Sequence, residues 1–91
     1  EKQPGIDLAD IQKRAVYPDL ARRAGIEGRV TVQVLIDKTG KPLKYQILES
    51  ANSVLNEAAA KAVMSGTYTP AIQNGSPIAI WANIPVVFKI R

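Results

Sequence analysis

The sequence predicts a single α+β domain in which two helices pack on one face of a three-stranded antiparallel sheet. Three observations lead to this fold class. Apolar residues alternate with polar ones in two segments that a short turn joins, a third alternating stretch ends the chain, and two other segments have helical spacing. The 91 residues are enough for one hydrophobic core and too few for two.

Composition narrows the possible functions. The chain has no cysteine, which excludes a disulfide framework and thiolate chemistry, and no histidine, the usual general base and commonest metal ligand. The net charge of +4 is scattered along the chain, and ordinary solvation explains it as well as a basic binding surface would. No stretch approaches the roughly 20 apolar residues of a membrane helix. We expect any anchor or export signal to lie outside this fragment.

Residues 1–16 are expected to form a lead segment with a short helix, ahead of the folded domain at 17–91. Asp7 is suited to cap that helix, and its apolar positions are three and four apart. Pro18 then suits the first position of a clearer helix, and Gly25 suits its left-handed end. The apolar stripe of this second helix is predicted to contain Leu20, Ala21 and Ala24.

A β-hairpin follows. In residues 29–37 the even positions are predicted to be buried and the odd ones exposed. Residues 37–41 form a tight turn in which Gly40 supplies a positive φ. The second strand is predicted to carry Leu43, Tyr45 and Ile47 on one face.

The next helix begins after a cap at Asn52 or Ser53 and ends near Gly66. Residues 67–70 are predicted to be extended and residues 73–77 to form a turn. The core-facing stripe of this helix contains Leu55, Ala58, Ala59, Ala62 and Val63.

The last segment alternates from Ile78 to Ile90, which is long for a strand. Pro85 lies inside it and cannot donate a ladder hydrogen bond, so the segment is predicted to be an edge strand or to contain a bulge. We expect it to pair with the first strand of the hairpin.

These residues together resemble the TonB C-terminal domain family. The resemblance covers roughly residues 11–91 and depends on many short pieces in the right order. They are Tyr17-Pro18, Ala21, the run 25–30, Ile36-Asp37 with Gly40, the alanine pairs of the last helix, Tyr68 with Pro70-Ala71, and the run 84–89.

The resemblance implies the same fold and a periplasmic binding domain of an energy transducer. In such a protein an inner-membrane helix, absent here, would couple to an ExbB/ExbD-type motor driven by the proton gradient. The domain would grip the N-terminal peptide of outer-membrane transporters, the TonB box, by adding it as a strand. Residues 14–16 depart from the Gln-Pro-Gln run of well-known members, so those contacts are not carried over. Sensor or secretion components of the envelope with a similar terminal domain are the alternative.

Strand addition would use the outer flank of the last segment. An edge strand presents unpaired N–H and C=O groups that an extended peptide can satisfy. If the nitrogen of Pro85 faces outward, residues of the same parity line that edge. The predicted partner-binding residues are Trp81, Asn83, Pro85, Val87 and Lys89, with Tyr17 and Arg22 from the first main helix.

Each of these residues also has a purely structural interpretation. Pro85 can serve to prevent edge-to-edge aggregation, which is compatible with binding. Trp81 is either partly buried under residues 70–77 or an exposed anchor. Tyr17 is expected to pack in the core with its hydroxyl at the surface, and Tyr45 and Tyr68 to be core residues.

Other function classes have weaker support. No spaced carboxylate pair, activated serine or phosphate loop is present, so the chain is predicted to be no enzyme and to need no cofactor or metal. Nucleic-acid binding through Trp81 is disfavoured, because no lysine- or arginine-rich stripe brackets it. The free edge could also pair with a second copy and give a homodimer.

Overall fold

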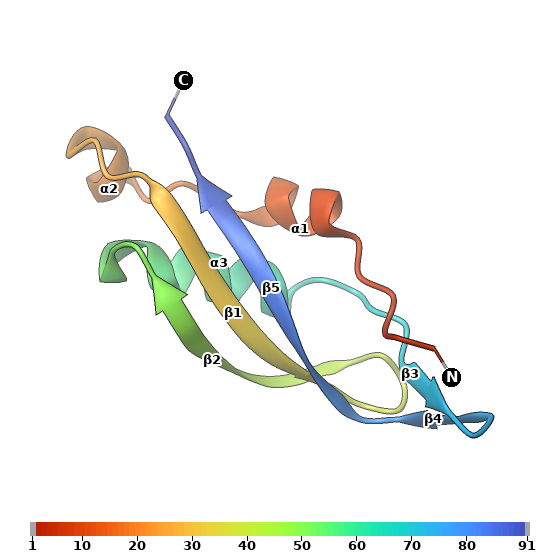
Figure 1. Cartoon of the computed structure of the whole chain (residues 1–91). Helices are drawn as coiled ribbons and strands as arrows, with labels where there is room; N and C mark the ends of the chain where they lie inside the picture. Colours follow the sequence, from red (N-terminus) through yellow and green to blue (C-terminus); the bar gives the residue numbers. More distant parts are fainter. Residues whose placement is uncertain (1, 91) are drawn as a thin grey trace.

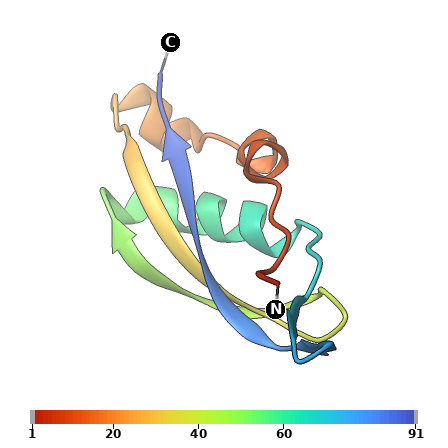
Figure 2. The same ribbon diagram turned by 45° about the vertical axis from the view of Figure 1, so that its right-hand side comes forward.

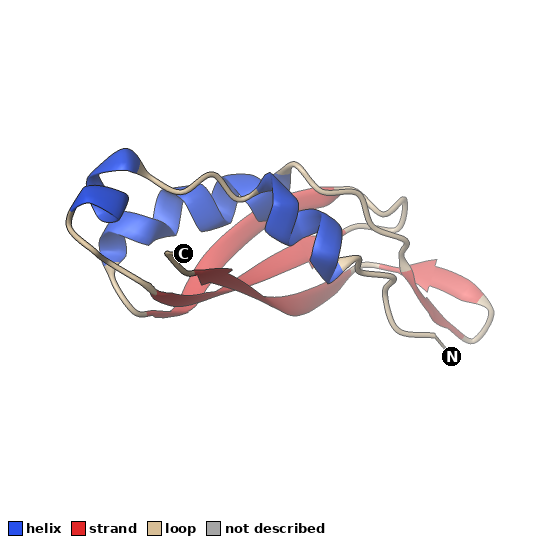
Figure 3. Cartoon of the chain, turned by 90° about the horizontal axis from the view of Figure 1, so that it is seen from above, coloured by secondary structure: helices blue, strands red, loops and turns tan. Residues whose placement is uncertain are grey.

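The chain folds into a layer of helices on a layer of sheet. The computed structural model describes residues 2–90. Within them a three-stranded antiparallel sheet carries the helices on one face, as Figure 1 and Figure 3 show. The molecule is elongated, with extents of 49 × 20 × 16 Å. The predicted α+β class with a three-stranded antiparallel sheet is confirmed.

The sheet is built around β1 (Gly28–Ile36), which pairs with β2 (Pro42–Ser50) on one side and β5 (Ile80–Phe88) on the other. Both pairings are antiparallel. The alternation predicted from the sequence places the even positions of β1 and β5 under the helices. Their buried side chains are Val30, Val32, Val34, Ile36, Ile84, Val86 and Phe88.

The helix layer contains α1 (Leu8–Arg14), α2 (Asp19–Arg23) and α3 (Asn56–Met64), with the 3₁₀ turn η1 (Ser53–Leu55) before α3. The predicted caps are present: the Asp7 carboxylate accepts from the N–H of Asp10 at 3.1 Å, and the Asn52 amide oxygen accepts from the N–H of Val54 at 3.0 Å. α1 lies on the same face of the sheet as the two predicted main helices, α2 and α3 (Figure 3).

α3 and α1 cover different parts of the sheet. α3 lies on β1 and β2, and its alanines permit a close approach. α1 packs beside α3 and contacts β5 (Figure 1). Ile11 of α1 is only 3% exposed and belongs to the core. α1 therefore lies on the β5 side of the helix layer.

The predictions for the second helix need two corrections. Pro18 is the residue before the first turn, with an extended ψ of 135°, so α2 begins at Asp19 and not at Pro18. Leu20 and Ala24 were both predicted to be in the apolar stripe but are exposed, Leu20 to 66%, whereas Ala21 is fully buried. A helix of five residues presents little more than one position to the core, and Ala21 occupies it.

The predicted face of the second strand is also corrected. Leu43 and Tyr45 are 51% and 47% exposed, and Tyr45 is therefore not a core residue. β2 is an edge strand whose pairing with β1 shifts twice, leaving Leu43 and Leu48 without partners in the register. Tyr45 faces the helix side opposite Val34 but lines an open groove between β2 and α3.

The terminal alternating stretch is shorter than predicted. β5 begins at Ile80, and the residues before it form β4 (Ser76–Ile78), which pairs with β3 (Ala71–Gln73) in a separate hairpin. The turn predicted at 73–77 is present, with φ of 53° at Asn74 and 79° at Gly75, the geometry that two-residue hairpin turns favour. The strands that flank this turn were not predicted.

The beginning of the lead segment runs along the extended residues that precede this hairpin. The N–H of Gly5 donates to the carbonyl of Thr69 at 3.1 Å, and the reverse bond is 3.2 Å long. Lys2 and Ile72 exchange a second pair of bonds. Residues 2–5 are thereby held against residues 69–72.

Gly40 provides a test of how the β1–β2 turn packs. Its φ is +88°, and a Cβ added there would lie 2.1 Å from the carbonyl oxygen of Tyr68. We expect Gly40→Ala to lower the free energy of unfolding by roughly 2 kcal/mol or more in urea denaturation. Gly75→Ala is the matched control, since Gly75 has a φ of +79° with no atom within 4 Å of the added Cβ. Equal losses in both variants would contradict the contact with Tyr68.

Asp37 gives the same turn a dependence on pH. Its carboxylate accepts from the hydroxyl and N–H of Thr39 and from the N–H of Lys41. The hydroxyl bond from Thr39 and then the N–H bond from Lys41 lower the pKa of Asp37 below the ordinary value of 3.8. A group with a lowered pKa in the folded state stabilises the fold above its unfolded pKa and loses that contribution as the pH falls through the folded value.

We therefore expect wild-type stability to fall between about pH 5 and pH 2 more steeply than that of Asp37→Asn, which keeps an acceptor oxygen but does not titrate. Urea unfolding at several pH values measures the difference. Glu49→Gln, on the exposed surface of β2, controls for the change in net charge. Parallel pH profiles of wild type and Asp37→Asn would show that the turn does not depend on this carboxylate.

Candidate binding edge

β5 lies at the border of the sheet. Within residues 2–90 it pairs with β1 alone, and the register runs without a shift from Gly28 opposite Phe88 to Ile36 opposite Ile80. Figure 2 shows β5 along the outer side of the sheet, with α1 beside its C-terminal half. No further strand lies on the outer flank of β5 in this part of the chain.

The contacts of Val87 show which backbone groups face outward. Its N–H and C=O both bond to the side chain of Gln12 and not to β1. Because groups of one parity point the same way along an unbulged strand, those of Trp81, Asn83 and Pro85 also face outward. We call the outward backbone groups of these four residues the β5 edge. Pro85 removes no bond to β1, because its nitrogen faces away from β1.

The side chains of the same residues lie on the open face of the sheet, opposite the helices. A row of amides crosses this face: Gln46 Nε2 donates to Gln33 Oε1 at 2.5 Å, and Gln33 Nε2 donates to Asn83 Oδ1 at 3.1 Å. The row ends at Asn83, on the border strand. A strand added beside β5 would place a side chain next to the Asn83 amide.

Trp81 is next to this row on the same face. The residue is 41% exposed, and Lys44 Nζ lies 5.7 Å from the ring centroid. The indole therefore stacks under a lysine from β2 on the open face, a cation–π contact between exposed groups. This position favours the interpretation of Trp81 as an exposed anchor.

Lys89 was predicted to lie on the edge, but it follows the end of β5 at Phe88 and lies next to Tyr17 and Arg22. The Tyr17 ring packs edge-on against Phe88, with centroids 5.5 Å apart, and Arg22 Cζ lies 5.6 Å from the Tyr17 ring centroid. Tyr17 and Arg22 line a surface pocket of about 360 Å³ together with Lys89 and Ile90. Tyr17 and Arg22 were predicted from the first main helix and Lys89 from the last segment, and the structure places them next to one another.

The hydroxyl of Tyr17 is used within the domain, since it donates to the carbonyl of Ile26. Burial is the main cause that raises the pKa of Tyr17; Glu27 raises it further and Arg22 opposes the change. The ring is half-buried, so the expectation of core packing holds in part, but its hydroxyl is bonded to the backbone.

The sequence did not predict that Gln12 of α1 bonds to this edge. Its position in the lead segment gave no sign of a contact with β5, because the two partners are 75 residues apart. A glutamine amide offers a donor and an acceptor like those of a peptide group, but only the placement of α1 reveals that it uses them on Val87.

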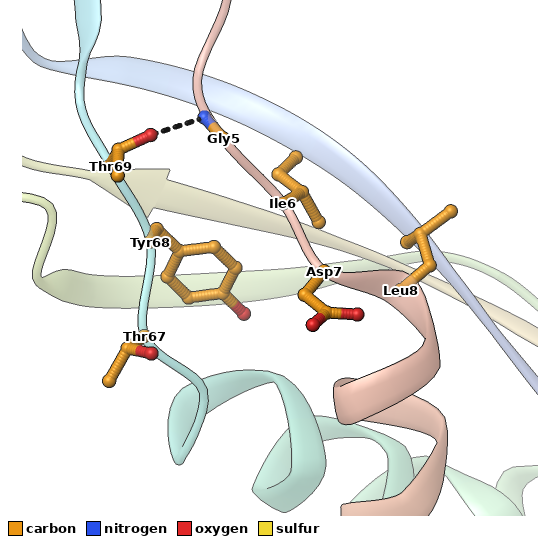
Figure 4. Close-up of a pocket in the computed structure, with 7 residues that line it drawn as sticks. All are labelled: Gly5, Ile6, Asp7, Leu8, Thr67, Tyr68 and Thr69. Atoms are coloured by element: carbon orange, nitrogen blue, oxygen red, sulfur yellow. Dashed lines mark hydrogen bonds between the residues drawn. The ribbon is translucent and has the colours of Figure 1, made fainter.

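A pocket outside the edge contains no set of groups suited to catalysis. It lies between the lead segment and residues 67–69 and has a volume of about 590 Å³ (Figure 4). The Asp7 carboxylate at its border caps α1, and the Tyr68 hydroxyl donates to the carbonyl of Val63 at 2.5 Å. Burial raises the pKa of Tyr68 to about 12, so this phenol stays protonated and cannot serve as a base.

Residues 2–90 also have neither a metal-binding cluster nor a membrane-spanning helix. They contain no cluster of three or more acidic, histidine or cysteine side chains that could hold a metal ion. None of the helices in this part of the chain has both the length and the apolar character of a membrane span.

Comparison with known sequences gives consistent matches. A family described as Gram-negative bacterial TonB protein C-terminal matches residues 13–90. The chain is 35% identical over 90 residues to Protein TonB of Vibrio cholerae, covering 98% of this chain and 36% of that protein. It is also 35% identical over 76 residues to Protein tonB2 of Pseudomonas aeruginosa, covering 82% of this chain and 28% of that protein. The chain thus spans about a third of these relatives.

Solved structures agree with the sequence matches. The solution structure of the Pseudomonas aeruginosa TonB C-terminal domain superimposes with a TM-score of 0.69 at 33% identity, covering 85% of this chain and 79% of that one. A Helicobacter pylori TonB C-terminal domain gives 0.69 at 25% identity, covering 90% and 87%.

These matches confirm the resemblance inferred from the short motifs. The C-terminal domain of Gram-negative TonB proteins is periplasmic and is not an enzyme, in agreement with the absence of a catalytic pattern in the sequence. With the family profile covering most of the sequence and the fold matching solved members, the chain belongs to the TonB C-terminal domain family.

Proposed function

We propose that the β5 edge binds an extended peptide by strand addition. The observation that carries this proposal is the border position of β5, whose outward N–H and C=O groups at Trp81 and Asn83 have no bonding partner within residues 2–90. A guest strand would satisfy these groups with little demand on its sequence. The exposed side chains on the open face would then supply selectivity.

The guest in this proposal is the TonB box at the N-terminus of an outer-membrane transporter. Support comes from membership of the TonB C-terminal family together with the geometry of the edge. The whole protein would be anchored in the inner membrane and would couple the energy of the proton gradient, through an ExbB/ExbD-type motor, to active import. These steps involve regions outside this chain.

Tyr17, Arg22 and Lys89 are proposed to make a second contact. They lie beside the C-terminal end of β5, where the part of a partner that flanks the added strand would pass. The two cations give this surface a positive charge that suits acidic side chains of the partner. Backbone pairing at the edge would supply the register, and this cluster would add side-chain contacts.

Replacing Asn83 separates backbone pairing from side-chain contacts. Asn83→Pro removes the outward N–H, whereas Asn83→Ala removes the same side chain but keeps that donor. We expect the proline variant to bind transporter N-terminal peptides about 3- to 10-fold more weakly than the alanine variant, as expected for one hydrogen bond. Isothermal titration calorimetry measures the affinities. Because the nitrogen of residue 83 does not bond to β1, both variants should keep the fold, which two-dimensional NMR spectra verify.

NMR titration with the same peptides locates the site. Shifts centred on residues 81–87 are expected, with the amides of Trp81 and Asn83 becoming protected from solvent exchange. Shifts confined to Tyr17 and Arg22 would move the primary site to α2 and count against strand addition at β5.

Salt dependence distinguishes peptide addition from phosphate binding. An uncharged guest strand held by backbone bonds should change its affinity by less than about 3-fold between roughly 50 and 200 mM salt, whereas a protein contacting 6–10 phosphates would lose about 10³–10⁵. Fluorescence of Trp81 provides the readout. A similarly steep loss for the peptide would count against backbone pairing, and binding of a single-stranded oligonucleotide with that steep salt dependence would support a nucleic-acid partner instead.

The same edge can also pair with its equivalent in a second copy. Sedimentation over a range of protein concentrations would detect such a homodimer. Peptide addition should then compete with dimer formation, because both processes would use the groups of Trp81 and Asn83.

A further inference from the structure

The side-chain amide of Gln12 makes the two hydrogen bonds to Val87 that a residue of a neighbouring strand would make. Gln12 Nε2 donates to the Val87 carbonyl at 2.5 Å, and the Val87 N–H donates to Gln12 Oε1 at 3.0 Å. A side-chain amide has the same donor and acceptor as a peptide group, so both outward groups of Val87 are satisfied. Neighbouring outward groups of β5 lack such a partner within residues 2–90.

α1 holds Gln12 in this position. Its neighbour Ile11 is buried in the core and anchors the helix. The helix is capped by Asp7 and carries an ion pair in which Arg14 Nε lies 2.8 Å from Asp10 Oδ2. Gln12 itself is exposed, so its amide reaches the border of the sheet from a fixed helix without taking part in the core.

Pro85 and Gln12 together limit the part of the β5 edge that is vacant. Trp81 and Asn83 each offer an outward donor and acceptor, and Pro85 offers a carbonyl alone. The next outward residue, Val87, is already paired. The vacant groups therefore end at Pro85, well before the end of the strand at Phe88.

We propose that Gln12 is a positioning residue that sets the end of the guest strand. This inference rests on the proposed strand addition at β5. A guest that pairs with Trp81 to Pro85 gains new hydrogen bonds. A guest that continues to Val87 must first break two bonds to Gln12 in order to form two of its own, so the continuation adds little affinity. Gln12 thereby selects for pairing centred on Trp81 and Asn83.

The test compares peptide length in two backgrounds. The probes are a peptide from a transporter N-terminus that pairs with residues 81–85 and two versions of it, each lengthened by three residues at one end. In wild type the extension that reaches Val87 should raise the affinity by no more than about 2-fold. In Gln12→Ala the extension that reaches Val87 should raise it about 3- to 10-fold, since the new bonds now replace bonds to water.

Lys13→Ala is the matched control, because it makes a similar change at an exposed neighbouring position of α1. Alanine is a good helix former, so neither variant should unfold the helix. The control should respond to peptide length as wild type does. An equal gain from the extension in wild type and Gln12→Ala would overturn the inference while leaving strand addition intact.

Hydrogen exchange of the free protein tests the contact without any peptide. The Val87 amide should exchange more slowly in wild type than in Gln12→Ala, while the control variant keeps its protection. Equal exchange of Val87 in wild type and Gln12→Ala would show that the contact is not formed, and the inference would fail whatever the peptides do. If no peptide perturbs Trp81 or Asn83 in either background, strand addition itself fails, and with it the proposed role in guest selection.

Discussion

The buried alternation of β1 and β5 is the constraint on which the rest of the structure depends. Even-numbered side chains of both strands fill the core, so a slip of one residue would expose that whole set and is strongly opposed. In this register the N–H and C=O groups of the even residues of β5 point toward β1 and form the hydrogen bonds between the two strands. The odd residues must then direct theirs away from the sheet. Core packing thus decides which groups form the β5 edge, and side chains on the open face can vary without moving it.

The two borders of the sheet are protected in different ways. β2 shifts its register twice against β1, and such bulges bend a strand and disturb the regular spacing that a further strand would need. β5 has no register shift over its whole length. Its regular border is therefore the better template for an added strand, and its protection comes from single groups, the imino nitrogen of Pro85 and the amide of Gln12.

The sequence predicted the sheet, the hairpin and the parity of the edge because alternation is a local property that the chain displays directly. It could not predict that Tyr45 is half exposed, because this depends on how far α3 extends over β2. It left two interpretations of Trp81 open for a similar reason: only the position of Lys44 on a neighbouring strand shows that the indole lies on the open face. The contact of Gln12 with Val87 could not be predicted, because nothing within the lead segment indicates the strand that Gln12 contacts.

An edge that receives a guest faces conflicting requirements. Its groups must be available, yet a long vacant border invites pairing between copies of the chain. A proline shortens the vacant stretch permanently, whereas a side-chain amide does so reversibly. The two bonds of Gln12 are solvent-exposed, and hydrogen bonds of this kind contribute only about 0.5–1.5 kcal/mol each. A partner's backbone can replace them at nearly equal free energy, so Gln12 can protect the end of β5 without closing it.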